Sequence, residues 1–278
     1  MPHIWIPLKL YAMSDKITFL HAVQLYRPSR AIVLGSGIAC GFKEYPVLAE
    51  TTWSVWPGLI PMPHVVGHAG SLRIVESPSG SPVLLIGGRL HRYEGHSSAV
   101  TTQLVRQLPE LGCTELILTC ATGGIDEQFG PGSIALITGW IDLALVEGSG
   151  QLVSLLQSNC LVEPVPDSAL KQLLLAQANG AQENLKHGIV AQMSGPSYET
   201  RAEIRMLRNW GASMVGMSSG HEWKAARGVG LDVQVLSLVT NWACGVVPGK
   251  IDHSAVVRES GAHATRLARI VMTQDFGK

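Results

Sequence analysis

The stretch ELILTCATGG, residues Glu115 to Gly124, is the clearest strand in this chain. Its long apolar run is typical of a strand that is buried on both faces of a sheet. The run ends in small residues and two glycines, which let backbone N–H groups approach a ligand closely. Close packing of a helix on the strand explains the small residues nearly as well. The stretch therefore predicts a covered sheet and leaves the role of its end open.

Five further apolar runs end in glycine or small polar residues, and helical patterns alternate with them. The runs lie at 31–37, 82–89, 133–143, 188–198 and 233–243, and the helical patterns at 97–111, 199–211 and 254–274. This alternation predicts an α/β fold with a covered central sheet, and ligands at the carboxyl ends of its strands. No internal repeat or linker is visible, so residues 1–278 are expected to form one domain.

The composition excludes several classes of protein. The chain has 21 basic and 21 acidic residues, which argues against a nucleic-acid groove, because neutralising phosphates needs a basic excess. Its five cysteines show no CxxC spacing, so neither a zinc site nor a disulfide framework is expected. The most apolar window, 134–146, contains Asp142 and is too short to span a bilayer, and the N-terminus lacks a signal-peptide pattern. A cytoplasmic protein without nucleic-acid or membrane partners is expected.

Three polar clusters in the last third of the chain carry the strongest functional signal. They are GPSYET (195–200), GMSS (216–219) and TNWACG (240–245). Together they offer the carboxylate of Glu199, the hydroxyl of Ser218 and the carboxamide of Asn241. This set suits a small polar ligand with donors and acceptors, such as an uncharged purine, and an anion is the other candidate because glycine-rich turns expose N–H groups. Taken singly, Glu199 could only complement a helix dipole and Asn241 could be satisfied structurally.

The segment GRLHRYEGH, residues 88–96, is the candidate for anion binding. Arg89 and His91 alternate, so on an extended segment both side chains would lie on the same side as a phosphate clamp. Tyr93 continues that side, and Glu94 could orient His91 by accepting its ring N–H. A solvated loop with scattered charge is about equally consistent with this segment.

Other residues are ambiguous on their own. Ser36, in the GSG turn at 35–37, could donate to an anion or lie in an ordinary tight turn. His68 in GHAG is equally open, and His253 could simply begin the last helix. Cys120 invites a nucleophile interpretation, but a cysteine at the end of a buried strand is more often a small apolar filler.

Taken in order, these motifs resemble the trimeric purine nucleoside phosphorylases and their relatives that cleave methylthioadenosine. The resemblance covers about 31–139 and about 188 to the last helix. Its motifs, in order, are GSG, GHAG, GRLHRYEGH, TCATGG, GPSYET, GMSS and TN. It implies a single α/β domain around a mixed sheet that tends toward a distorted barrel flanked by helices. It also implies a homotrimer that uses inorganic phosphate as co-substrate and needs no metal or organic cofactor.

The resemblance also assigns roles by position, with His91, Glu199 and Asn241 as catalytic residues. The residues assigned to phosphate are Ser36, His68, Arg89, His91, Ala121 and Ser218. The residues assigned to the nucleoside are Tyr93, Tyr198, Glu199, Met217, Asn241 and His253.

The chain departs from the family pattern in several places. Cys120 and Thr122 replace a common asparagine and alanine, Ala39 ends a GSGIA motif, and GMSSGHE replaces a proline-bearing form. The family's histidine-bearing segment is absent from 142–170, and no aromatic residue lies between Leu143 and Leu185 to serve the neighbouring subunit's sugar site. A looser sugar site is therefore expected.

The expected activity is reversible phosphorolysis of purine nucleosides, with 6-oxopurines preferred, to free base and pentose 1-phosphate. A methylthioadenosine phosphorylase is the nearest alternative, although an acidic residue at position 241 would suit a 6-aminopurine better. A non-catalytic nucleoside-binding protein is the alternative from a different class, and a hydrolase that uses water is disfavoured by the retained phosphate residues.

Overall fold

The computed structural model describes residues 15–55, 61–65, 68–144, 162–248 and 252–272. Its strands are β1 (Arg30–Leu34), β2 (Val47–Thr52), β3 (Ser71–Glu76), β4 (Pro82–Gly87), β5 (Glu115–Gly124), β6 (Ile134–Asp142), β7 (Glu163–Pro164), β8 (Lys186–Gln192), β9 (Met214–Gly216) and β10 (Asp232–Trp242). Its α-helices are α1 (Asp15–Tyr26), α2 (Ser98–Thr101), α3 (Gln103–Gln107), α5 (Ala169–Gly180), α6 (Arg201–Asn209), α7 (Ser219–Gly228) and α8 (His253–Met272). The 3₁₀ turns are η1 (Ile38–Phe42), η2 (Trp53–Val55), η3 (Arg92–Glu94) and η4 (Leu108–Leu111).

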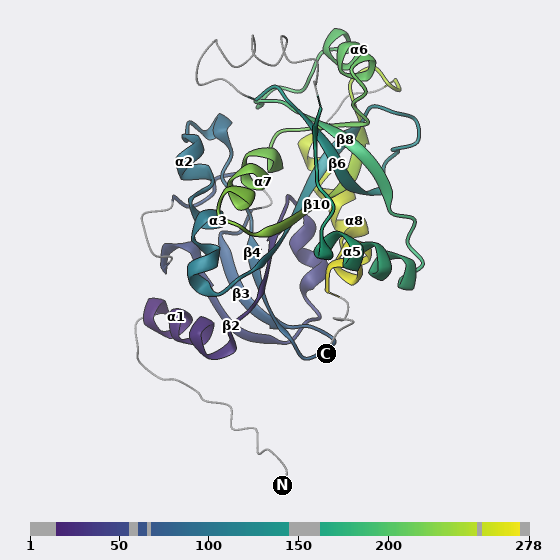
Figure 1. Cartoon of the computed structure of the whole chain (residues 1–278). Helices are drawn as coiled ribbons and strands as arrows, with labels where there is room; N and C mark the ends of the chain where they lie inside the picture. The colour runs from purple at the N-terminus through teal and green to yellow at the C-terminus, as the bar shows by residue number, and fades with distance from the viewer. Residues whose placement is uncertain (1–14, 56–60, 66–67, 145–161, 249–251, 273–278) are drawn as a thin grey trace.

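Five strands close a barrel at the centre of the molecule (Figure 1). Their order is β10, β6, β8, β9 and β5, and β5 pairs back with β10 to complete the ring. The sheet then continues outward from β5 through β1, β4, β3 and β2. Strand β5 is parallel to β1 and β10 but antiparallel to β9. The predicted mixed sheet that tends toward a barrel is therefore confirmed.

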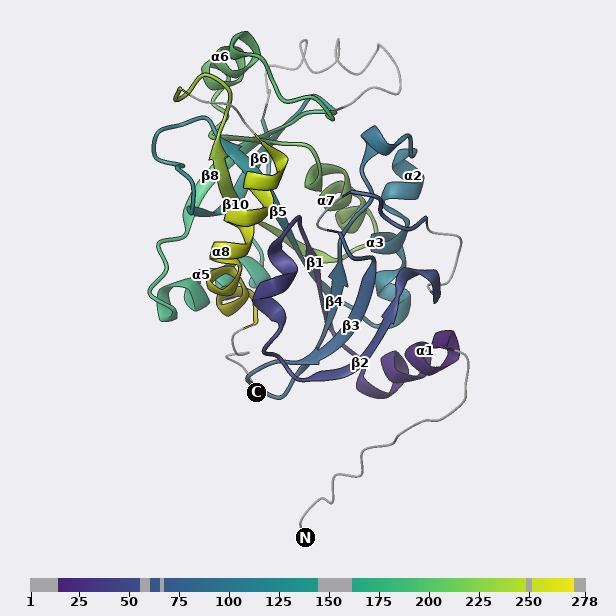
Figure 2. The ribbon, with the colours of Figure 1, turned by 180° about the vertical axis from the view of Figure 1, so that it is seen from behind.

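The central strands are covered on both sides, as their continuous apolar runs predicted. Leu116 and Leu118 of β5 pack in one buried cluster, while Ile117 packs in another on the opposite face. Val33 and Ile32 of β1 divide between the same two clusters, because successive side chains of a strand point to opposite faces. Helix α7 packs on β5 and β10, and helix α8 packs on β10 and η1. Figure 1 views the barrel from the side of α7, and Figure 2 from the side of α8.

Several elements differ from the sequence-based expectation. The pattern at 97–111 forms α2, α3 and η4 in place of one helix, because Thr102 leaves helical geometry and Pro109 follows in the next turn. The pattern at 199–211 begins only at Arg201, so Glu199 precedes the helix. Strands β2, β3, β7 and β9 and helices α1, α5 and α7 were not foreseen. In the described ranges, no helix is both long enough and apolar enough to cross a membrane.

Candidate active site

A pocket opens beside the ends of β5, β9 and β10, and most of the predicted site residues meet there. Ten of them line it: Ser36, His91, Tyr93, Ala121, Tyr198, Glu199, Met217, Ser218, Asn241 and His253. The remaining two, His68 and Arg89, are not among its lining residues. The fold thus brings together residues that are up to 217 positions apart in sequence, from Ser36 to His253. Their individual roles stay predictions.

The GSG turn places Ser36 at the pocket, where its side chain contacts His68. Gly37 has a φ of 74°, the left-handed region that favours glycine, which is the conformation that the motif predicted. The turn follows β1, and the N–H of Gly35 donates to Thr119 Oγ1 over 3.0 Å. The hydroxyl of Ser36 lies 3.1 Å from Nε2 of His68. Ser36 therefore has a defined orientation at the edge of the pocket.

Glu94 orients His91, as the sequence suggested. A carboxylate oxygen of Glu94 accepts from the backbone N–H of His91 over 2.7 Å and lies 3.1 Å from its Nδ1. The His91 ring stacks on Tyr93 with ring centroids 4.6 Å apart, and the His68 ring lies 5.2 Å from it. When Nδ1 carries the proton that Glu94 accepts, Nε2 is the ring nitrogen left for a ligand.

Burial keeps both histidines neutral at pH 7. Burial and, to a smaller extent, the nearby Arg89 charge lower the pKa of His68 to about 2 and that of His91 to about 4. The hydrogen bond from Glu94 partly offsets the effect on His91. A bound anion would add a negative charge beside these rings and raise their pKa values.

We expect the protein to lose stability as the pH falls below about 6.5, where unfolded histidines take up protons and these two do not. Because the folded pKa values lie below the unfolded one, the unfolded state binds more protons between about pH 6.5 and 4. Each histidine should lower the free energy of unfolding by roughly 1.4 kcal/mol between pH 7.5 and 5.5. Urea unfolding at both pH values checks this, with a His68→Asn/His91→Asn double variant as control. An equal pH dependence in the two proteins would contradict it.

Arg89 does not line this pocket with His91, because its guanidinium pairs with Glu222 of α7. Its Nε and Nη2 both lie 3.0 Å from Oε2 of Glu222 on α7, and its Nη1 donates to the Thr119 carbonyl over 2.8 Å. The two side chains are 2% and 6% exposed. Strand β4 ends at Gly87, so Arg89 and His91 both lie beyond it, and His91 has an extended backbone conformation. A direct contact between Arg89 and phosphate stays a prediction.

Glu199 presents a buried carboxylate to the pocket. The adjacent helix α6 is fixed by a capping box, in which Thr200 Oγ1 accepts from the N–H of Glu203 and the Glu203 carboxylate accepts from the N–H of Thr200. Burial raises the pKa of Glu199, and among the described residues its Oε1 is buried without a hydrogen-bond partner. Such an atom requires a donor, which a ligand can supply.

The GPSYET motif also shapes the wall of the pocket. Gly195 has a φ of 68°, and a Cβ there would come within 2.7 Å of both Met217 and Tyr93. A side chain at this position would displace two residues that line the pocket. Glycine is therefore required here by backbone conformation and by packing.

The amide of Asn241 has a fixed orientation. Its Oδ1 accepts from the Thr240 hydroxyl over 2.9 Å, and its Nδ2 donates to the Trp242 carbonyl over 2.9 Å. One of the two amide hydrogens is left for a ligand. The register of β10 against β5 shifts between Val239 and Asn241, and such bulges often re-aim a side chain at a site. Thr240 is a positioning residue that sequence reasoning missed.

Ser218 is free to bind a ligand because another residue caps α7. Ser218 is the N-cap of this helix, yet its hydroxyl makes no cap hydrogen bond. The N–H of Gly220 donates instead to the side-chain carbonyl of Gln192, at the end of β8. Sequence reasoning missed Gln192, since its only signal was a polar residue at the end of an apolar run.

Cys120 is a packing residue in this structure. It is 4% exposed, and burial raises the pKa of its thiol, which disfavours the thiolate that a nucleophile needs. Its neighbour Thr122 pairs with the buried hydroxyl of Ser237 over 2.5 Å.

The expectation of a looser sugar site rests largely on residues 145–161, which lie outside the described residues.

Comparison with known proteins agrees with this geometry. Residues 29–273 match the phosphorylase superfamily. The chain is 36% identical over 248 residues to a purine nucleoside phosphorylase of Mycobacterium tuberculosis, covering 87% of this chain and 86% of that protein. It is 34% identical over 252 residues to purine nucleoside phosphorylase 1 of Geobacillus stearothermophilus, covering 88% and 90%. A crystal structure of Schistosoma mansoni purine nucleoside phosphorylase with adenosine superposes with a TM-score of 0.72 at 26% identity, covering 95% of this chain and 99% of that one.

Proposed function

Because the chain belongs to the phosphorylase superfamily, we propose that it is a purine nucleoside phosphorylase, a pentosyltransferase that cleaves purine nucleosides reversibly with phosphate. One observation supports this most directly: neutral donors and a buried carboxylate face the same pocket. Ser36, His91 and Ser218 lie on its wall together with Glu199 and Asn241. The first three suit an anion, and the last two suit a purine that has both donors and acceptors.

The proposed reaction is a single displacement at the anomeric carbon. A phosphate oxygen forms a bond to that carbon as the bond to the purine N9 breaks, and the bonding electrons move onto the purine. The sugar passes through an oxocarbenium-like state, so the protein accelerates the reaction by stabilising the departing base and aiming the phosphate. The remaining N–H of Asn241 donates to the purine as negative charge develops there. No covalent intermediate with the protein is needed.

The base preference follows from Glu199 and Asn241. A 6-oxopurine carries a proton on N1 and acceptors at O6 and N7. The orphaned Oε1 of Glu199 can accept from N1–H, and the fixed amide of Asn241 can donate to the acceptors. Adenosine has a lone pair at N1, which would face the Glu199 carboxylate. A 6-oxopurine is therefore the preferred base.

The wider context of the enzyme is also a proposal. It takes inorganic phosphate as co-substrate, needs no metal or organic cofactor, and works as a homotrimer in the cytoplasm. The low charged fraction of the chain, 15%, supports some surface being covered in an oligomer.

A substrate panel with and without phosphate tests the proposed function. We expect inosine and guanosine to be consumed only when phosphate is present, and adenosine and methylthioadenosine to react far more slowly. Faster cleavage of methylthioadenosine would favour the methylthioadenosine phosphorylase alternative. Cleavage without phosphate would indicate a hydrolase. Nucleoside binding without turnover would indicate a non-catalytic binding protein.

A further inference from the structure

The first turn of α7 lacks the cap that other helices of this chain have. Helices α2, α5 and α6 follow Ser97, Ser168 and Thr200, which have an extended backbone, and each of these side chains accepts from the N–H three residues further on. Ser218 occupies the same place before α7, but its φ of −131° and ψ of −65° lie outside that extended region, and its side chain makes no cap hydrogen bond. The N–H groups of this turn therefore need another acceptor.

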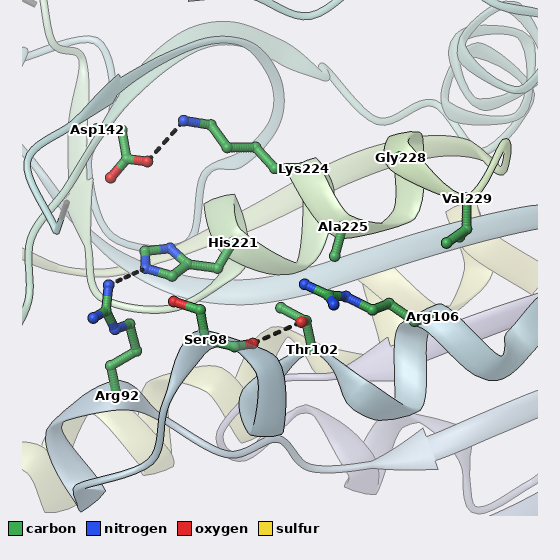
Figure 3. Close-up of a pocket in the computed structure, with 10 residues that line it drawn as sticks. All are labelled: Arg92, Ser98, Thr102, Arg106, Asp142, His221, Lys224, Ala225, Gly228 and Val229. Atoms are coloured by element: carbon green, nitrogen blue, oxygen red, sulfur yellow. Dashed lines mark hydrogen bonds and ion pairs between the residues drawn. The ribbon is translucent and has the colours of Figure 1, made fainter. Parts of the chain in front are cut away.

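Gln192, at the end of β8, supplies that acceptor. Its side-chain carbonyl accepts from the N–H of Gly220, the second residue of α7. Its NH₂ group contacts Nδ1 of His221, a residue of the first turn of α7 whose Nε2 lies 3.2 Å from Nη1 of Arg92 (Figure 3). Gln192 is 1% exposed, and both ends of its amide have a partner in α7. The amide is therefore fixed in one orientation against this turn.

Gly220 makes room for the amide. A Cβ at this position would overlap Oε1 of Gln192 and come within 3.0 Å of its Cδ. A larger residue would therefore push the amide away from the N–H that donates to it. The two residues are complementary, because one supplies the acceptor and the other leaves space for its close approach.

Ser218 lies between two contacts that join the end of β8 to the start of α7. The N–H of Met193, next to Gln192, donates to the Gly216 carbonyl over 2.8 Å. The side chain of Gln192 then holds Gly220, on the other side of Ser218 in sequence. Among the described residues, the hydroxyl of Ser218 has no hydrogen-bond partner, and Ser218 lines the pocket. The end of β8 thus determines where this hydroxyl lies.

We propose that Gln192 is a positioning residue for phosphate binding, which rests on the proposed function, in which Ser218 contacts phosphate. Without Gln192 the buried N–H of Gly220 would lose its acceptor, which is unfavourable. Ser218 can supply an acceptor by adopting the extended conformation that caps the other helices. Its hydroxyl would then turn toward the helix and away from the pocket. Gln192 therefore keeps this hydroxyl available to phosphate.

Binding of inorganic phosphate, measured by calorimetry, tests this without any turnover. Gln192→Met keeps the volume of the side chain but removes the acceptor. We expect it to weaken phosphate binding by about tenfold, because a hydrogen bond to a charged group is lost. Gly220→Ala should weaken binding similarly, since the added methyl group displaces the same amide. In steady-state kinetics, both variants should raise the KM for phosphate and leave the KM for the nucleoside nearly unchanged.

The chain offers a matched control in a second buried glutamine. Gln234 of β10 is also 1% exposed, and its Nε2 donates over 3.0 Å to the hydroxyl of Ser168, the N-cap of α5. Neither residue lines the pocket. Gln234→Met should therefore lower the free energy of unfolding in urea but leave phosphate binding unchanged.

A double-mutant cycle shows whether Gln192 acts through Ser218. In a Ser218→Ala background the hydroxyl is already absent, so Gln192→Met should weaken phosphate binding no further. Equal weakening in both backgrounds, or equal weakening by Gln192→Met and Gln234→Met, would overturn the proposal. Absence of phosphate binding by the unmodified protein would overturn the proposed function together with this inference. Normal binding that Gln192→Met leaves unchanged would overturn this inference alone.

Discussion

Replacing Glu199 with alanine should lower kcat/KM for inosine by at least about 100-fold and leave the slow adenosine reaction nearly unchanged. The carboxylate is buried, and its Oε1 has no partner among the described residues, so the N1–H of a 6-oxopurine is the donor that it needs. Hydrogen bonds to charged groups contribute about 1.5–3 kcal/mol, and buried polar sites can discriminate by as much as ~10⁴-fold. Adenosine has no proton at N1 to donate to Glu199, so its kcat/KM should change little when Glu199 is replaced.

Steady-state kinetics with both nucleosides check this, and the chain offers a matched control. Glu203→Gln removes a carboxylate four residues away but keeps the capping box, because glutamine can also accept from the N–H of Thr200. Its kinetics should match those of the unmodified protein.

Asn241→Asp should raise the ratio of kcat/KM for adenosine to kcat/KM for inosine, since a carboxylate that shares a proton with N7 can still accept from the 6-amino group. If the kcat/KM of the unmodified protein for adenosine equals or exceeds its kcat/KM for inosine, the base assignment is wrong.

Replacing Arg89 with alanine should lower the free energy of unfolding by about 3–5 kcal/mol, because it leaves the buried carboxylate of Glu222 without its partner. The same variant should raise the KM for phosphate more than the KM for the nucleoside. The sequence predicted only this second effect. The first follows from the ion pair with α7.

A double variant separates the two effects. Arg89→Met with Glu222→Leu removes both charges and keeps apolar volume, so most of the stability should return. The KM for phosphate should stay high if Arg89 also assists phosphate binding. Urea unfolding and phosphate kinetics on the single and double variants give both answers. A loss of less than 1 kcal/mol in Arg89→Ala would contradict a structural role for the pair, and recovery of the phosphate KM in the double variant would contradict a role in binding.

The sequence by itself determined the central strands and most of the pocket. Leu116, Ile117 and Leu118 form a continuous apolar run because β5 is covered on both faces. Such a run is a local pattern, so it can be recognised in the sequence alone. Ser36 closely follows the end of β1 and Asn241 lies near the end of β10, and strand ends in such folds gather at one place. The order of the motifs identified the family correctly.

Other features could be decided only by the tertiary structure, because they depend on contacts between distant segments. Strands β2 and β9 are short or partly exposed, so they carry no long apolar run, and the closure of β5 on β10 has no sequence signal. The partner of Arg89 is Glu222, 133 residues away, and it redirected a side chain whose local spacing pointed toward the pocket. Gln192 is a polar residue whose role arises only when β8 meets α7, where its side chain accepts from the N–H of Gly220. Local pattern reports burial and turn geometry, whereas the pairing of polar groups is set by which segments the folded chain brings together.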